Sequence, residues 1–291
     1  MSDMETDAGN AGDGPGPETV DGLRAVADTL ACSGGDVARR MLAELAAPGL
    51  GARSKSSATD PVTVVDTSVE DHLRRELAAH RPDDRMLGEE SGETGGVTEA
   101  APSADGRVRW IVDPVDGTVN LLYGIPFTAV SIAAELDGVV VAGAVHNIVT
   151  RETWTAARGR GATLRDADGT VTTLDVSGCD ELALALVGTG FAYDSAVRAE
   201  QGRVVADLLP RVRDIRRCGS AALDLCMLAT GRLDAYYERC LKPWDHAAGA
   251  LIAEEAGAVV APSYDDAVPT VAAAPGVARE FREALESCGA L

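Results

Sequence analysis

Apolar residues recur at helical spacing near the start of the chain and at strand spacing in its middle. The helical pattern covers 18–45, broken by a Gly-Gly pair at 34–35, and resumes over 66–80, where Asp66 or Thr67 is expected to cap the first turn. Strands separated by tight turns are predicted at 107–113, 128–138, 139–149 and 152–158.

Strands and helices alternate in the last third of the chain. The pattern predicts strands at 182–190, 212–217 and 232–238 and helices at 195–209, 220–230 and 245–257. Such a mixture is typical of a layered α/β protein and argues against a sandwich or a helical bundle. We expect one domain over 21–291, built from two joined α/β halves with the switch near 175–185, after a disordered acidic tail over 1–20.

Composition narrows the possible partners. With 46% apolar residues among 291, the chain can bury the core of such a domain. A formal net charge of −20 makes nucleic acid a poor partner, because phosphate backbones bind clustered Lys and Arg. No apolar run reaches the roughly 20 residues of a membrane span, and the N-terminus lacks a signal-peptide pattern. We expect a cytoplasmic protein with no membrane partner.

The six cysteines form no Cys-x-x-Cys pair, so buried thiols are expected rather than a zinc or redox motif.

The stretch "WIVDPVDGTVN" (110–120) places two carboxylates where an apolar strand is predicted to stop. Pro114 should end the strand and leave Asp113 at its end, where α/β folds commonly bind ligands. Gly117 permits a tight turn, and the residues after it can start a short helix whose free N–H groups would face an anion. Asp113 and Asp116 could therefore hold a divalent cation beside a phosphate, although an Asp-Gly turn that merely joins two elements is the alternative. An EF-hand is excluded because its later oxygen ligands are missing.

Further carboxylates occur in similar settings. Glu89 and Glu90 follow a short apolar strand, and Asp245 starts a helix. Alone, each would indicate a solvated edge or a helix cap. Together with the two aspartates they supply enough oxygen for two or three Mg²⁺ ions. The polar segment 91–107 between two of these acidic stretches is interpreted as a flap that becomes ordered when metal binds.

Four separated stretches resemble the inositol monophosphatase family, the Mg²⁺-dependent, lithium-sensitive phosphatases. They are "KSSATDPVTVVD" (55–66), "GEES" (88–91), "DPVDGTVN" (113–120) and "KPWDHAAG" (242–249), in the family's order and spacing. The segment 216–238 is similar to the inositol monophosphatase branch in particular. The resemblance implies a layered α-β-α-β-α, sugar-phosphatase-like fold and a homodimer.

The resemblance also implies the metal ligands. Glu89, Asp113 and the carbonyl of Val115 would hold the first Mg²⁺, and Asp113, Asp116 and Asp245 would hold the second. A third, weaker ion would rely on Glu89 and water.

The remaining roles follow from the same motifs. Asp66 and Thr118 would form a hydrogen-bonded pair that orients the attacking water and accepts its proton, with Glu90 as support. Lys55 matches a family lysine near the metals, and a surface charge is the alternative reading. The resemblance implies that the phosphate contacts the amides of Gly117 and Thr118, and that the polyol contacts Gly219, Ser220, Ala221 and Glu238.

The sequence thus predicts a Mg²⁺-dependent phosphomonoesterase that hydrolyses inositol 1-phosphate to myo-inositol and phosphate. Related enzymes that use the same carboxylates act on fructose 1,6-bisphosphate, histidinol phosphate or phosphoadenosine phosphate, and the ligands alone do not separate these substrates. A bisphosphate would need a second basic site, with Lys242 and the arginines of 212–217 as candidates, and an adenosine would favour an aromatic surface. A non-catalytic interaction protein on the same fold is the alternative from a different class.

Overall fold

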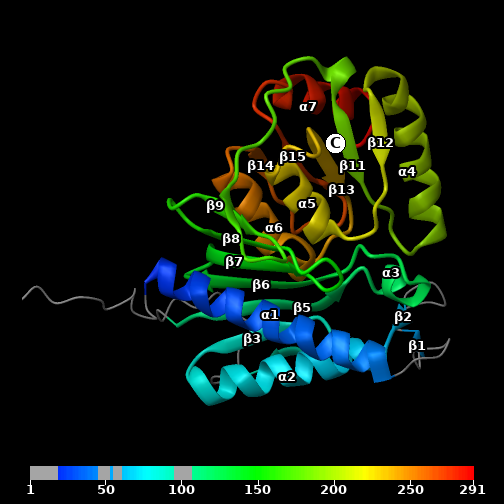
Figure 1. The fold of residues 1–291 in the computed structure, drawn as a ribbon. Helices are drawn as coiled ribbons and strands as arrows, with labels where there is room; N and C mark the ends of the chain where they lie inside the picture. Colours follow the sequence, from blue (N-terminus) through cyan, green and yellow to red (C-terminus); the bar gives the residue numbers. More distant parts are fainter. Residues whose placement is uncertain (1–18, 45–52, 55–60, 95–106) are drawn as a thin grey trace, which may run out of the picture.

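Two β-sheets and three layers of helices alternate in the structure, a computed structural model that describes residues 19–44, 53–54, 61–94 and 107–291. Helices α1 and α2 cover the outer face of the first sheet, α5 and α6 lie between the two sheets, and α4 and α7 cover the outer face of the second (Figure 1). Three clusters of buried apolar side chains fill the spaces between these layers. The predicted α-β-α-β-α arrangement is confirmed.

The first sheet has eight strands in the order β10-β9-β8-β7-β6-β5-β3-β4. Its pairs are antiparallel except for β3 and β5, which run parallel. The strands are β3 (Arg85–Gly88), β4 (Gly92–Thr94), β5 (Arg109–Asp116), β6 (Ala129–Leu136), β7 (Val139–Asn147), β8 (Thr153–Ala157), β9 (Ala162–Arg165) and β10 (Val171–Thr173). Strands β1 (Arg53–Ser54) and β2 (Pro61–Val62) form a separate antiparallel pair.

The second sheet has five strands in the order β12-β11-β13-β15-β14. They are β11 (Leu186–Thr189), β12 (Asp214–Arg216), β13 (Ala235–Glu238), β14 (Val259–Ala261) and β15 (Thr270–Ala273). The strand expected at 182–190 is shorter, because its first residues form the 3₁₀ turn η1 (Leu182–Leu184). The chain passes from one sheet to the other between β10 and β11, and the domain limits and the switch near 175–185 remain a proposal.

Five of the helices, α1, α2, α4, α5 and α6, occur where the apolar periodicity predicts them, and α3 follows Gly117 as expected, whereas α7 was not predicted. The bounds of the helices are α1 (Val20–Glu44), α2 (Val64–His80), α3 (Thr118–Tyr123), α4 (Ser195–Leu208), α5 (Ala221–Ala229), α6 (Pro243–Glu255) and α7 (Ala278–Ser287), with a 3₁₀ turn η2 (Leu209–Arg211) after α4. Three predictions fall wholly or largely outside the described residues: the acidic tail, Lys55 and the flap. Of the flap, the described residues 92–94 form β4.

The first helix is not interrupted at its glycine pair, contrary to the prediction. α1 runs through Gly34 and Gly35, which are buried against neighbouring elements. A Cβ on Gly34 would lie 3.3 Å from side-chain atoms of Val69 and Val130, and a Cβ on Gly35 would lie 2.4 Å from the His146 ring. The glycines therefore permit close packing of the helix.

Two expected element ends are also wrong. The N-cap of α2 is Thr63, neither Asp66 nor Thr67, and Asp66 instead accepts a hydrogen bond from the Thr63 N–H in a capping box. Strand β5 does not stop at Pro114 but continues to Asp116 through an irregularity between Asp113 and Asp116. Proline is tolerated there because a bulge leaves its position without a ladder hydrogen bond to donate.

All six cysteines are free thiols. The prediction that they are buried is correct for Cys226 alone, because the other five are partly exposed. In the described part of the chain, no helix is long and apolar enough to cross a membrane.

A buried histidine connects α1 to the first sheet. The His146 Nδ1 atom lies 2.8 Å from the Thr153 hydroxyl, and Nε2 lies 3.0 Å from the Arg39 Nη1 atom. Because Arg39 can only donate, Nε2 accepts and the ring hydrogen is on Nδ1. Burial, followed by the nearby Arg39 cation, lowers the pKa of His146 to about 4.

Because the pKa of His146 is low in the folded protein, we expect a loss of stability in mild acid. Between about pH 6.5 and pH 4 the unfolded chain binds a proton at His146 that the folded chain does not, so stability is complete above this window and falls as the pH drops through it. From pH 7 to pH 5 the loss is roughly 2 kcal/mol. Urea unfolding of the wild type and of His146→Gln should show a smaller acid-induced loss in the variant. An equal loss in both proteins would contradict the assignment.

Candidate active site

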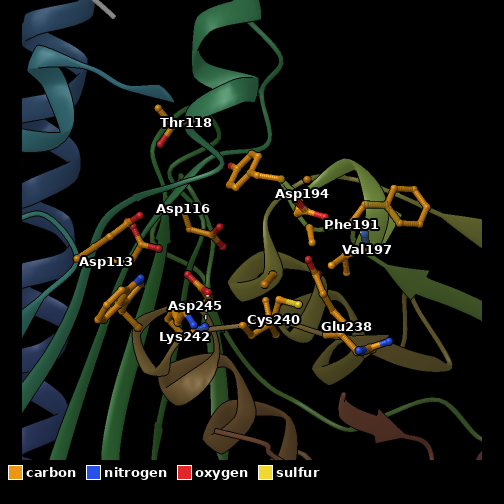
Figure 2. A pocket seen from close by; sticks show the side chains of 18 of the residues that line it. Asp113, Asp116, Thr118, Phe191, Asp194, Val197, Glu238, Cys240, Lys242 and Asp245 are labelled. Carbon is orange, nitrogen blue, oxygen red and sulfur yellow. Dashed lines mark hydrogen bonds between the residues drawn. The ribbon is translucent and has the colours of Figure 1, made fainter. Parts of the chain in front are cut away.

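A cavity of about 490 Å³ lies where the first sheet meets the elements of the second half. Its walls come from the ends of β3, β5 and β13, the starts of α5 and α6, and residues 191–197 before and within α4. All five predicted metal-ligand residues, including Val115 with its carbonyl, and the polyol candidate Glu238 are among the lining residues. In Figure 2, Asp113 and Asp116 project from β5, Asp245 from α6, and Glu238 from the opposite wall.

The irregular end of β5 positions the two aspartates. Asp113 Oδ1 accepts the N–H of Val115 at 3.0 Å, which closes the local turn. Asp116 Oδ2 accepts the Ser220 hydroxyl at 2.6 Å and the Ala222 N–H at 2.7 Å. Asp116 thereby ties β5 to the first turn of α5 and still faces the cavity.

Burial and mutual repulsion disfavour the charged forms of these acids. The pKa of Asp113 is held well above its usual range by burial first and then by Glu89, Asp116 and Asp245. Burial likewise raises the pKa of Asp116 to about 6, against the lowering effect of the Ser220 hydrogen bond. The folded protein thus keeps carboxylates together at an electrostatic cost that a cation would offset.

Glu89 and Asp245 complete this acidic group. The Glu89 N–H donates to Val112 O at 3.2 Å and extends the β3–β5 pairing by one residue. In the first turn of α6, Asp245 accepts the Lys242 N–H at 2.6 Å. Its pKa is raised by burial and then by the charge of Glu89.

The donor set fits Mg²⁺. Among the described residues, no group of three or more His, Cys, Asp or Glu side chains is placed so that it could hold a metal ion directly. The fit is in the chemistry of the donors, because Mg²⁺ prefers carboxylate oxygens and keeps several of its own waters. Glu89, Asp113, Asp116 and Asp245 could hold such ions.

Asp66 and Thr118 meet although they are 52 residues apart. Asp66 is fully buried on α2, and its Oδ1 accepts the Thr118 hydroxyl at 2.7 Å. The same hydroxyl lies 3.0 Å from Val115 O, the carbonyl expected to be a metal ligand. Thr118 lines the cavity, so the predicted pair is in contact beside the acidic group.

A turn at Gly219 lies against the start of α3. Its φ of 96° lies in the left-handed region, and a Cβ there would come within 2.9 Å of Asn120 Nδ2. Asn120 donates to Phe127 O and to Cys218 O, each at 2.8 Å, and so joins the two turns. Asn120 received no role from the sequence, although it ends the stretch 113–120.

Glu238 forms the opposite wall with partners that the sequence did not indicate. The Tyr236 hydroxyl donates to Glu238 Oε2 at 2.7 Å. Burial raises the pKa of Glu238 to about 7, while the Tyr236 hydrogen bond and Arg217 act in the other direction. Asp224 is also buried, and burial followed by the charge of Glu238 raises its pKa.

The remaining predicted residues have different positions. Gly219 and Ala221 line the cavity, whereas Ser220 is buried and donates its hydroxyl to Asp116. Gly117 precedes α3 in a left-handed conformation, and Glu90 lies in the turn after β3. The described residues do not include Lys55.

Buried carboxylates around a polar cavity are typical of enzymes that hydrolyse phosphate esters with divalent cations, and this protein is a phosphoric monoester hydrolase. The chain belongs to the inositol monophosphatase family, whose model matches residues 21–285.

Individual relatives are similar to this chain over most of its length. The chain is 52% identical over 274 residues to inositol-1-monophosphatase SuhB of Mycobacterium tuberculosis, which covers 91% of this chain and 93% of that protein. A solved structure of Mycobacterium tuberculosis SuhB has a TM-score of 0.79 at 48% identity and covers 92% and 97% of the two chains. A protein of Pasteurella multocida named Nus factor SuhB is 36% identical and covers 80% of this chain and 85% of its own length.

Proposed function

We propose that this enzyme hydrolyses inositol 1-phosphate to myo-inositol and inorganic phosphate with the help of two or three Mg²⁺ ions. The observation that carries the proposal is the group of four carboxylates, Glu89, Asp113, Asp116 and Asp245, which line one cavity with Glu238 opposite. Relatives 52% identical to this chain bear the name of that activity.

The acidic group would bind the metal ions in the proposed mechanism. Glu89, Asp113 and Val115 O would hold the first ion, Asp113, Asp116 and Asp245 the second, and Glu89 would support a third. Bound Mg²⁺ would neutralise the phosphoryl oxygens, make a water more acidic and stabilise the departing alkoxide.

The other residues would orient and deprotonate the attacking water. Because the Thr118 hydroxyl donates its single hydrogen to Asp66, its lone pairs remain available to a water in the cavity. Thr118 would accept a proton from that water while passing its own to Asp66, with Glu90 as support. The backbone amides of Gly117 and Thr118 would bind the phosphate.

The polyol would lie between the phosphate and Glu238. A carboxylate accepts several hydrogen bonds and suits the vicinal hydroxyls of inositol. Gly219 and Ala221 would contact the ring, and Ser220 would act through its hydrogen bond to Asp116.

Two features of the cavity keep other esters as candidates. Arg217, Arg239 and Lys242 line it, so cations for a second phosphate are present, although Lys242 Nζ is paired with Asp266 at 2.8 Å. Phe191 and Tyr193 also line it, which gives an adenosine an aromatic surface despite the low aromatic content of the chain.

A substrate panel tests this proposal. Phosphate release is measured with Mg²⁺ and with EDTA on inositol 1-phosphate, fructose 1,6-bisphosphate, histidinol phosphate and phosphoadenosine phosphate. We expect EDTA-sensitive release, fastest from inositol 1-phosphate, and a fall in kcat/KM of about 10–100-fold for that substrate in Glu238→Ala, since a charged hydrogen bond contributes roughly 1.5–3 kcal/mol. Preference for another ester, or an unchanged kcat/KM in Glu238→Ala, would reject the polyol assignment. No release from any ester would favour an interaction role.

The assembly and location are proposed on the family resemblance. We propose a homodimer, a cytoplasmic location and inhibition by lithium. Size-exclusion chromatography with light scattering tests the first of these directly.

A further inference from the structure

Helix α2 directs two buried carboxylates at two different parts of the site. Asp66 and Glu70 are four residues apart, so they lie on the same face of the helix one turn from each other. Asp66 contacts Thr118 at the start of α3, whereas Glu70 contacts the turn after β3 that carries Glu89 and Glu90. Only 2% of Glu70 is exposed, and no step of the proposed mechanism uses it.

Four donors converge on the Glu70 carboxylate. Oε2 accepts the Glu90 N–H at 2.8 Å, and Oε1 accepts the Ser91 N–H at 3.1 Å. The Ser91 hydroxyl and, at 2.9 Å, Arg74 Nη2 also donate to Oε1. A carboxylate can accept all four bonds through its two oxygens, whereas the amide of Gln has one oxygen and two hydrogens of its own.

Gly88, the residue before Glu89, passes close to the Glu70 carboxyl group. A Cβ on Gly88 would lie 2.5 Å from Glu70 Cδ, so a glycine at the end of β3 leaves room for this carboxylate. On the other side of the turn, the Glu89 N–H is held by Val112 O of β5. Three consecutive amides, those of 89, 90 and 91, are therefore fixed, one by the sheet and two by Glu70.

We propose that Glu70 is a positioning residue that holds the turn 88–91 so that the Glu89 carboxylate faces the cavity. The inference deepens the proposed function and rests on Glu89 as a metal ligand. Loss of the Glu70 charge would release the amides of Glu90 and Ser91, and Glu89 would lose its orientation toward the cation. Groups that support metal ligands in this way typically contribute 10–100-fold in metal affinity or activity.

Glu70→Gln tests the proposal with little change in volume. We expect the Mg²⁺ concentration for half-maximal turnover to rise about 10-fold, with the KM for inositol 1-phosphate changed less than about two-fold at saturating Mg²⁺. Calorimetric titration of the substrate-free protein with Mg²⁺ should show the same loss of affinity, and the amides of 90 and 91 should exchange faster with solvent. Glu76→Gln is the matched control, because Glu76 lies on the same helix, is half-exposed and pairs only with His80 at 3.7 Å among the described residues.

Two further variants separate the possible outcomes. Ser91→Ala removes one exposed donor to Glu70 and should raise the Mg²⁺ requirement in the same direction by about three-fold, even if Glu70→Gln fails to fold. Glu89→Gln tests the metal ligand itself. If Glu89→Gln raises the Mg²⁺ requirement while Glu70→Gln and Ser91→Ala leave it unchanged, the positioning role is wrong and the proposed function stands. If Glu89→Gln leaves it unchanged, the metal assignment fails and the positioning role with it.

Discussion

Asp113→Asn is expected to lower kcat by at least about 1,000-fold at any Mg²⁺ concentration. Asp113 is the one side chain assigned to both principal metal ions, and it is 2% exposed at the bulge of β5. Asn keeps the size and can still accept the Val115 N–H, so the local turn is preserved while the charge is lost. The expected loss therefore measures the charge rather than the fold.

Stability measurements should separate this variant from a misfolded one. In the metal-free protein, burial and the charges of Glu89, Asp116 and Asp245 disfavour the charged form of Asp113. Asn removes this cost, so the Tm of the metal-free variant should be equal to that of the wild type or higher. Mg²⁺ should raise the Tm of the wild type and of Asp207→Asn, a control at an exposed position of α4, but not that of Asp113→Asn. A variant that retains a tenth of wild-type turnover, or still gains stability from Mg²⁺, would contradict the assignment.

The sequence predicts the framework of the fold well because local patterns determine it. Nearly continuous apolar runs within 128–138 and 139–149 produce β6 and β7, and the turn at Asp137 and Gly138 joins them through two positive φ angles. The errors occur where tertiary contacts override a local rule. The Gly34–Gly35 pair does not interrupt α1 because close packing stabilises the helix, and Pro114 does not end β5 because a bulge accommodates it.

The residues of the candidate site also divide into those that local patterns predict and those that only tertiary contacts determine. Carboxylates inside recognisable stretches, such as Asp113 and Asp245, could be predicted, because each follows a strand or starts a helix. The role of Glu70 and the position of Asp224 beside Glu238 could not, because both depend on groups from distant segments that sequence spacing does not reveal. The spacing of Glu70 four residues after Asp66 was the one available signal.

Thr118→Ala is expected to lower kcat by about 100- to 1,000-fold while the Mg²⁺ concentration for half-maximal turnover changes less than about three-fold. The hydroxyl donates to Asp66 Oδ1 at 2.7 Å, and no described contact shows it holding another carboxylate of the site. Its loss should therefore affect the attacking water and leave cation binding intact. This combination is the opposite of that expected for Glu70→Gln.

Two companion variants complete the test of the Asp66–Thr118 pair. Thr118→Ser keeps the hydroxyl and should retain kcat within about 10-fold, and Thr67→Ala on exposed α2 surface should match the wild type. Asp66→Asn should lower kcat by about 100-fold and also destabilise the protein by about 1 kcal/mol, because Asp66 belongs to the capping box of α2 as well as to the pair. Wild-type kcat in Thr118→Ala would exclude the hydroxyl from proton transfer. A rise in the Mg²⁺ requirement of Thr118→Ala comparable to that of Glu89→Gln would instead place its effect on the metal site, because Thr118 also contacts the carbonyl of Val115.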